Sequence, residues 1–176
     1  TSNRAKGFDC SGFVGWAAYQ VMQTQSNVGY GYTVVSGEIG SYYSGKGWGS
    51  IVNQSYLSQN GWTLKPGDIG YNSGHTWIVI GQCSDKSVVI VHSTPQAGVQ
   101  ISGTTTPTGD YSSQAVALAK KYMSMYAGYN IFSYHPSVGN YIRNGNFLRW
   151  NSSVLSDPDG YGNMTADQIL YDLFGK

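Results

Sequence analysis

Charged residues are scarce in this sequence of 176 residues. Asp, Glu, Lys and Arg make up 11% of the chain, well below the roughly 25% of ordinary soluble domains. The formal net charge is +1, and the Lys and Arg residues form no cluster, so the sequence lacks the basic surface that nucleic-acid-binding proteins use. Glycine and tyrosine, with 24 and 15 residues, supply much of the polarity instead. This composition favours an extracellular or cell-wall-associated protein.

Long apolar runs are also missing. No run approaches the roughly 20 residues that a helix needs to cross a bilayer, so we expect no membrane span. The hydrophobic fraction of 40% and the aromatic fraction of 14% are nevertheless those of a chain that folds around a core. The length favours one globular domain over residues 1–176. We expect it to be monomeric, and it can be part of a longer protein.

Cysteine is rare, and this limits the chemistry of the chain. The two cysteines are Cys10 and Cys83, and the three histidines lie at no metal-ligand spacing, so we expect no metal site. In a secreted protein, an even number of cysteines favours a disulfide. A catalytic role for Cys10 requires a free thiol, so the two interpretations exclude each other.

Residues 9–23 predict a helix that begins at Cys10. Four apolar residues follow the i, i+3, i+4, i+7 spacing of a buried helical stripe: Val14, Ala17, Ala18 and Val21. Asp9 is a good N-cap and would place Cys10 at the first helical position. A helix N-terminus and a nearby imidazole both favour the thiolate form of a cysteine, which is the nucleophilic form.

A hairpin follows in the middle of the chain. Two β-branched, apolar segments predict strands: HTWIVI at 75–80 and SVVIVH at 87–92. The short polar loop between them predicts an antiparallel hairpin in which Ile80 pairs with Ser87. In that register His75 lies directly opposite His92, with Cβ atoms about 5 Å apart. A slip of one residue would place the two rings on opposite faces of the sheet.

Other elements are predicted from local signals. We expect short helices near 37–43 and 50–58, a turn at 66–68 that starts a strand, a helix at 112–127, a hairpin at 141–150 around Asn144-Gly145, and a final helix to Phe174 that opens with a capping box at 165–168.

These positions suggest a catalytic triad. Cys10 is the candidate nucleophile, His75 the candidate base, and His92 the group that holds the base in the required orientation. A lone cysteine and a lone histidine are more often structural. Three residues of the required types at consistent positions favour catalysis.

Three segments also resemble the NlpC-type cysteine peptidases that cleave bacterial cell wall: GFDCSGFVGWA, LKPGDIGYNSGHTWIVIG and VIVHSTPQAGVQIS. The resemblance covers about residues 7–102, and residues 103–176 have no counterpart in the family. It implies a papain-like α+β fold, in which the nucleophile begins a helix packed on an antiparallel sheet, here with a C-terminal extension. It also implies the triad roles of Cys10, His75 and His92.

The resemblance further implies a substrate. Family members are peptidoglycan hydrolases that cut stem-peptide amide bonds, commonly the γ-D-glutamyl–diamino acid bond, through a thioester intermediate and without a cofactor. Asp9, Ser11 and Trp77 are then candidates for substrate binding, with Asp9 and Ser11 near the free amino end of the stem peptide. The helix cap and a first-turn hydroxyl are equally reasonable roles for Asp9 and Ser11. A bacterial secreted enzyme and a phage or conjugation lysin both fit this activity.

Two functional alternatives remain open. One is an amidase of the same fold that cuts between the lactyl group and L-Ala, and the other is a non-catalytic module that binds cell wall. The family usually places an oxyanion-stabilising Tyr about ten residues before the nucleophile. This sequence does not include that segment, so the second oxyanion donor is unassigned. The family has no role for Cys83, and a disulfide between Cys83 and Cys10 would abolish the activity, so we expect two free thiols.

Several other residues attract attention for their chemistry. A calcium loop is suggested by Asp157, Asp159 and Asp167, but Tyr161 and Gln168 occupy positions where an EF-hand needs oxygen ligands, so a turn and a helix cap are favoured. His135 is expected to be an ordinary surface or half-buried histidine. Four aromatic residues can line a groove or belong to the core: Tyr42, Tyr43, Trp48 and Trp62.

Overall fold

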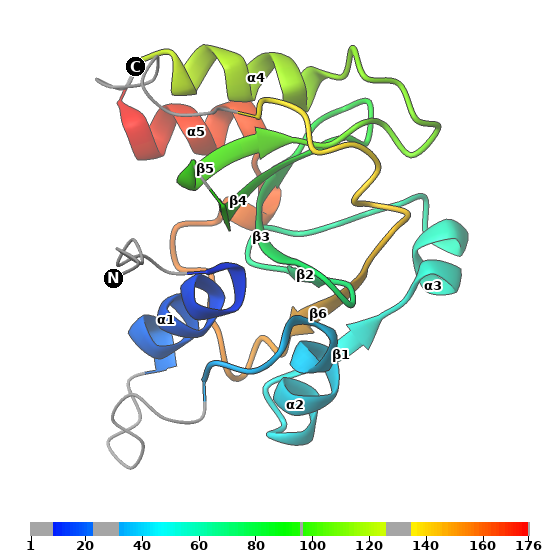
Figure 1. Cartoon of the computed structure of the whole chain (residues 1–176), viewed down its shortest axis with the longest axis vertical. Coiled ribbons are helices and arrows are strands. Elements are labelled where there is room, and N and C mark those ends of the chain that lie inside the picture. Colours follow the sequence, from blue (N-terminus) through cyan, green and yellow to red (C-terminus); the bar gives the residue numbers. More distant parts are fainter. Residues whose placement is uncertain (1–8, 23–31, 96, 126–134, 176) are drawn as a thin grey trace, which may run out of the picture.

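The computed structural model describes residues 9–22, 32–95, 97–125 and 135–175. In this part of the chain five α-helices pack on a six-stranded antiparallel sheet, which confirms the expected α+β class (Figure 1). The helices are α1 (Cys10–Met22), α2 (Ile39–Gly45), α3 (Gln54–Gln59), α4 (Gln114–Met123) and α5 (Ala166–Phe174). The strands are β1 (Gly49–Val52), β2 (Ile69–Tyr71), β3 (Thr76–Gln82), β4 (Val88–Thr94), β5 (Gly98–Gly103) and β6 (Asn146–Trp150). None of the helices in the described ranges is long and apolar enough to cross a membrane.

Strand β6 lies inside the sheet. The strand order is β1-β6-β2-β3-β4-β5, so β6 pairs with β1 on one side and with β2 on the other. The hairpin predicted at 141–150 is therefore wrong, because residues 141–144 form a turn and do not pair with β6. Phe147 and Leu148 are both fully buried, on opposite faces of the sheet, and this burial stabilises the long-range pairing. Strand β6, which follows β5 by more than 40 residues, thus completes the sheet that β1 to β5 form.

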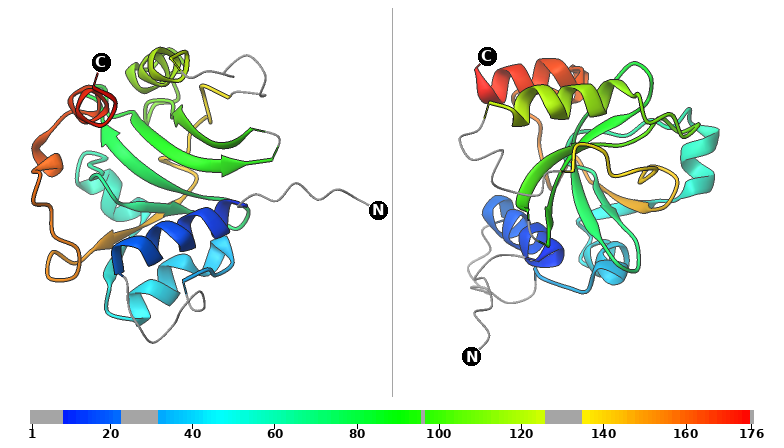
Figure 2. Two further views of the ribbon diagram at one scale, coloured as in Figure 1. Left: turned by 90° about the vertical axis from the view of Figure 1, so that its left-hand side faces the viewer. Right: turned by 45° about the horizontal axis from the view of Figure 1, so that its top comes forward.

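Helices cover the sheet in two groups (Figure 2). Helices α1 and α2 pack on an apolar cluster that includes Ile69 and Leu148, whereas α4 and α5 pack on a cluster that includes Val89 and Ile101. A third cluster, around Trp77, Val79, Ile90 and Phe147, is covered by α3 and by the segments that flank it. Apolar clusters therefore cover both faces of the central strands.

The β3–β4 hairpin exists, but its predicted register is wrong by two residues. Ile78 pairs with Val91, where the prediction gave Val89, and a bulge between Val79 and Gly81 then shifts the pairing once more. Helix α5 packs directly on Gly81, where a Cβ atom would lie 2.8 Å from the Cα of Ala166. An even shift keeps each side chain on the same face of the sheet. The two histidines therefore still share a face, as diagonal neighbours.

The helix predictions hold with local corrections. Helix α1 begins at Cys10 as predicted, but Val21 is 55% exposed, and the buried positions are Phe13, Val14, Gly15 and Ala18. Helices α2 and α3 overlap in sequence with the two short helices predicted near 37–43 and 50–58, but residues 49–52 form strand β1. Helix α4 begins after the cap Ser113, and the predicted positions 126 and 127 lie outside the described residues. The capping box of Thr165 and Gln168 is confirmed at the start of α5.

Candidate active site

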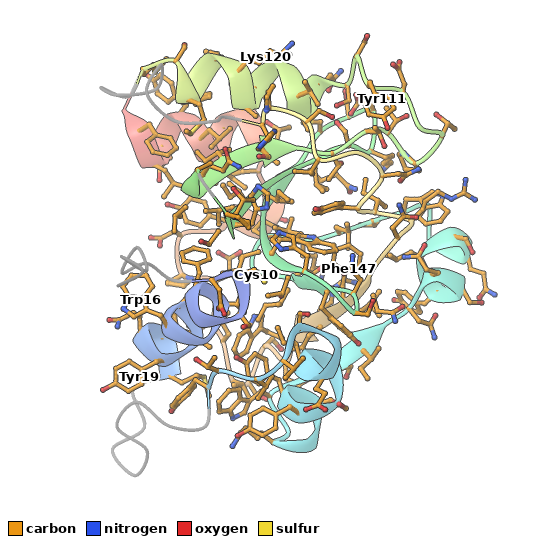
Figure 3. All side chains as sticks on the ribbon, viewed as in Figure 1. Cys10, Trp16, Tyr19, Tyr111, Lys120 and Phe147 are labelled. Atoms are coloured by element: carbon orange, nitrogen blue, oxygen red, sulfur yellow. The ribbon has the colours of Figure 1, made fainter. Side chains whose placement is uncertain are left out.

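Cys10 occupies the first position of α1, at the end of the helix nearest the strands (Figure 3). One carboxylate oxygen of Asp9 accepts hydrogen bonds from the backbone N–H of Gly12 at 2.6 Å and from the hydroxyl of Ser11 at 3.0 Å. Asp9 is therefore the N-cap, as its sequence position predicted. The Cys10 thiol therefore lies at the positive end of the helix dipole.

His75 lies at the end of a tight turn between β2 and β3. The side-chain oxygen of Asn72 accepts hydrogen bonds from the backbone N–H groups of Gly74 at 2.9 Å and His75 at 2.8 Å. The backbone N–H of Asn72 also donates to the carbonyl of His75 at 2.9 Å. Asn72 thus fixes the backbone of the candidate base, a role that sequence analysis missed. The signal was available, since asparagine typically closes such turns with its own side chain.

His75 and His92 are brought together as predicted. His75 Nε2 and His92 Nδ1 lie 2.8 Å apart, and the two rings meet edge to face at 75°. His92 is 1% exposed, and burial together with the neighbouring His75 and His135 lowers its pKa to about 3. Burial also lowers the pKa of His75. At neutral pH both imidazoles are therefore neutral, and His75 can accept a proton.

Tyr141 connects the histidine pair to Cys10. Its ring lies edge to face against His75, with centroids 5.7 Å apart, and it packs on Trp77 at 4.5 Å. Burial and the charge of the Cys10 thiolate raise the pKa of Tyr141, so its hydroxyl remains a hydrogen-bond donor. Sequence analysis missed this residue because it belongs to residues 103–176, where no motif marked it.

Cys10 begins a helix that contacts the two strands beside the histidine pair. Helix α1 packs on β3 and β4, through contacts of its core residues with Ile78 and Val91. Within the described residues the Cys10 thiol makes no hydrogen bond to His75 or His92. In many enzymes without bound substrate, catalytic hydrogen bonds are long or poorly aligned and shorten only when the substrate binds.

Trp77 does not have the position expected of a substrate-binding residue. Its side chain is fully buried in the core, so it presents no surface to a substrate. The ring is packed against Gly70 and Gly145, where a Cβ atom would come within 2.0 Å and 2.7 Å of it, respectively. Trp77 therefore has a structural role: its indole ring stacks beside the imidazole of His75, with their centroids 6.0 Å apart, and supports it.

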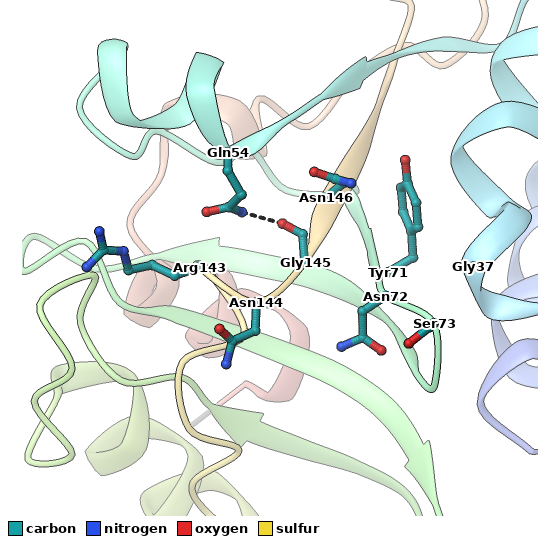
Figure 4. A pocket seen from close by; sticks show the side chains of 9 residues that line it. All are labelled: Gly37, Gln54, Tyr71, Asn72, Ser73, Arg143, Asn144, Gly145 and Asn146. Carbon is teal, nitrogen blue, oxygen red and sulfur yellow. Dashed lines mark hydrogen bonds between the residues drawn. The ribbon is translucent and has the colours of Figure 1, made fainter.

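A polar cavity of about 450 Å³ opens beside the turn that carries His75 (Figure 4). Its walls carry side-chain amides and one cation: Gln54, Asn72, Asn144, Asn146 and Arg143. The amide of Gln54 donates to the carbonyls of Ile142 and Gly145, and this fixes the loop that follows Tyr141. The cavity therefore adjoins both segments that position the candidate base.

Cys83 has no contact with this site. It is 7% exposed and lies in the cluster covered by α4 and α5. Both cysteines are free thiols, so the disulfide alternative does not apply. Burial raises the pKa of Cys83 to about 12, which leaves almost no thiolate at neutral pH.

The candidate calcium ligands do not converge. The carboxylate of Asp157 accepts hydrogen bonds from the backbone N–H groups of Tyr161 at 2.9 Å and Gly162 at 2.7 Å. Asp167, in the first turn of α5, instead pairs with Lys121 of α4 at 3.4 Å. No group of three metal-ligating side chains occurs in the ranges that the structure describes. The segment is therefore a turn followed by a helix start, and the calcium interpretation is not supported.

The four aromatic residues proposed for a groove mostly belong to the core. Tyr43 is fully buried, and its ring packs on Trp48, which in turn stacks on Trp150. Tyr42 packs on the edge of this cluster. Trp62 lies instead beneath the guanidinium of Arg143, 5.3 Å away, next to the polar cavity.

Comparison with protein-family models, with curated proteins and with solved structures gives no match. The function of the protein is therefore inferred from its own residues. The sequence motifs and the arrangement of Cys10, His75, His92 and Tyr141 are the observations available for that inference.

Proposed function

We propose that this protein is a cysteine peptidase with a papain-like catalytic arrangement that hydrolyses amide bonds in the peptide part of bacterial cell wall. The observation that carries the proposal is the pairing of His75 with His92 at 2.8 Å, together with Tyr141, which packs on His75 and interacts electrostatically with the thiol that begins helix α1. A nucleophile, a base and an orienting group are the minimum that such chemistry requires.

The proposed reaction begins with proton transfer from the Cys10 thiol to His75. The thiolate attacks the acyl carbon, and the negative charge moves to the carbonyl oxygen. The backbone N–H of Cys10, in the first turn of α1, and the Tyr141 hydroxyl are the candidate donors to this oxyanion. When the C–N bond breaks, His75 gives its proton to the leaving amine. Water, deprotonated by His75, then hydrolyses the thioester and releases the acid and the thiol.

The substrate class is proposed from the motifs and from the cavity. The D-C-S-G, P-G-D and H-T-W segments resemble those of enzymes that act on peptidoglycan stem peptides, commonly at the γ-D-glutamyl–diamino acid bond. The amides that line the cavity can pair with the backbone of such a peptide, since an amide both donates and accepts hydrogen bonds. The proposed site of action is extracellular or at the cell wall.

Mass spectrometry of digested muropeptides tests this proposal. We expect new termini at a stem-peptide amide bond with the intact protein, none with Cys10→Ser, and unchanged products with the matched control Cys83→Ser. Products with a free lactyl group and a new L-Ala amino terminus would identify an amidase of the same chemistry. If no muropeptide bond is cut, while binding to cell wall is retained, the hydrolase proposal is wrong.

A further inference from the structure

A buried serine lies behind the histidine pair. Ser102, on β5, is fully buried, and its Oγ lies 2.6 Å from the carbonyl oxygen of His135 and 3.0 Å from His92 Nε2. A carbonyl oxygen can only accept, so the hydroxyl proton of Ser102 is used in the bond to His135. Toward His92 the serine oxygen can then only accept, which requires a proton on His92 Nε2.

This proton determines the direction of the next hydrogen bond. His92 is buried and neutral, so the proton on Nε2 leaves a lone pair on Nδ1. That lone pair lies 2.8 Å from His75 Nε2, which must therefore carry the proton of this bond. In neutral His75 the lone pair is then on Nδ1. These three hydrogen bonds form a chain, here called the ladder, in which every donor points the same way. The ladder runs from His75 through His92 and Ser102 to the carbonyl of His135.

We propose that Ser102 is a positioning residue that fixes the tautomer of His92 and, through it, the tautomer of His75, so that Nδ1 of His75 is the basic nitrogen. The catalytic part of this inference rests on the proposed function, but the tautomers are a property of the folded protein alone. Ser102 contacts neither substrate nor reacting atoms in this proposal, and it acts only through His92.

The opposite ladder shows why the serine matters. If His92 carried its proton on Nδ1, it would donate to His75 Nε2, and the proton of neutral His75 would then lie on Nδ1. His75 would present an N–H group to the thiol and could not accept its proton. With Ser102 bonded to His135, that arrangement would also leave two lone pairs facing each other between His92 Nε2 and the serine oxygen. The buried hydroxyl therefore selects the reactive ladder.

The decisive measurement is the tautomeric state of both histidines, read from imidazole ¹⁵N shifts of the full chain above the pKa of His75. We expect protonated Nε2 and unprotonated Nδ1 in both residues. Protonated Nδ1 in His92 would overturn the proposal, and this result needs no variant. If the tautomers are as expected but no muropeptide is cut, the proposed function fails and the tautomer inference stands.

Variants then connect the tautomers to catalysis. Ser102→Ala should populate the opposite tautomers and lower kcat on muropeptides by about 10²-fold, the lower end of what acid–base catalysis contributes, with little change in KM. Ser102→Thr keeps the hydroxyl and should restore both. The control Thr104→Val removes another buried hydroxyl, which bonds to Val88 and Thr105, and should change neither tautomer. Unchanged tautomers and kcat in Ser102→Ala would contradict the proposal.

Discussion

The ring of Tyr141 packs edge to face against the imidazole of His75, with their centroids 5.7 Å apart. The two residues are far apart in the sequence: His75 follows β2 and Tyr141 precedes β6, and the pairing of β2 with β6 brings them together. A residue that no motif marked thus lies beside the candidate base and interacts with the candidate nucleophile.

This contact predicts the effect of removing one hydroxyl. Tyr141→Phe keeps the ring on His75 and Trp77 but removes the candidate oxyanion donor. We expect kcat on muropeptides to fall by about 10²-fold, as when one oxyanion donor is lost in other enzymes, with unchanged thermal stability. Tyr122→Phe is a matched control, since Tyr122 is a buried tyrosine in the cluster covered by α4 and α5, away from the cavity. An unchanged kcat in Tyr141→Phe would exclude the hydroxyl from catalysis.

The two cysteines should differ strongly in reactivity. Cys10 is partly exposed at a helix N-terminus, whereas burial excludes reagent from Cys83 and raises its pKa to about 12. At neutral pH we expect iodoacetamide to label Cys10 much faster, with adducts located by peptide mapping. His75→Ala should slow the labelling of Cys10 and leave that of Cys83 unchanged. Equally slow labelling of both thiols in the native protein would argue against a catalytic Cys10.

Burial of His92 predicts a specific loss of stability in acid. In the unfolded chain His92 binds a proton near pH 6.5, whereas the folded protein binds it only near pH 3. Between these values the unfolded state holds more protons, so the free energy of unfolding falls as the pH falls, by at most about 1.4 kcal/mol per pH unit. Urea unfolding of wild type and His92→Asn between pH 4 and pH 7 measures this difference. Parallel curves for the two proteins would contradict this, because they would mean that His92 takes up its proton at the same pH in the folded and unfolded states.

A buried ion pair locks β6 to the turn before β2. Arg149 donates to both carboxylate oxygens of the buried Asp68, with Nη2 at 2.6 Å from Oδ2. Burial raises the pKa of Asp68, and the guanidinium of Arg149 opposes this shift. Arg149→Met leaves a buried carboxylate without its partner, so we expect a loss of about 3–5 kcal/mol in urea unfolding.

The exposed pair of Lys121 and Asp167 provides the contrast. Lys121→Met should leave the unfolding midpoint almost unchanged, because exposed ion pairs contribute little. The double variant Asp68→Asn with Arg149→Met should recover part of the stability lost in Arg149→Met, since no unpaired charge is then buried. A stable Arg149→Met protein would show that Asp68 is already neutral in the fold.

Features that depend on residues close together in the chain could be predicted from the sequence. The cap of Asp9 before Cys10 and the capping box of Thr165 and Gln168 are hydrogen bonds between residues three positions apart, so their spacing is visible in the sequence. The alternation of the hairpin strands placed His75 and His92 on one face, because an even register shift preserves the faces.

The contacts between segments far apart in the chain could not be predicted from the sequence and became clear only from the structure. The register and bulge of β3 and β4, the place of β6 in the sheet and the burial of Trp77 depend on apolar area buried between segments far apart in the chain. Tyr141 and Ser102 reach the histidine pair for the same reason. Burial is collective, and local spacing does not encode it, so the sequence predicted Cys10, His75 and His92 but not the residues that hold them.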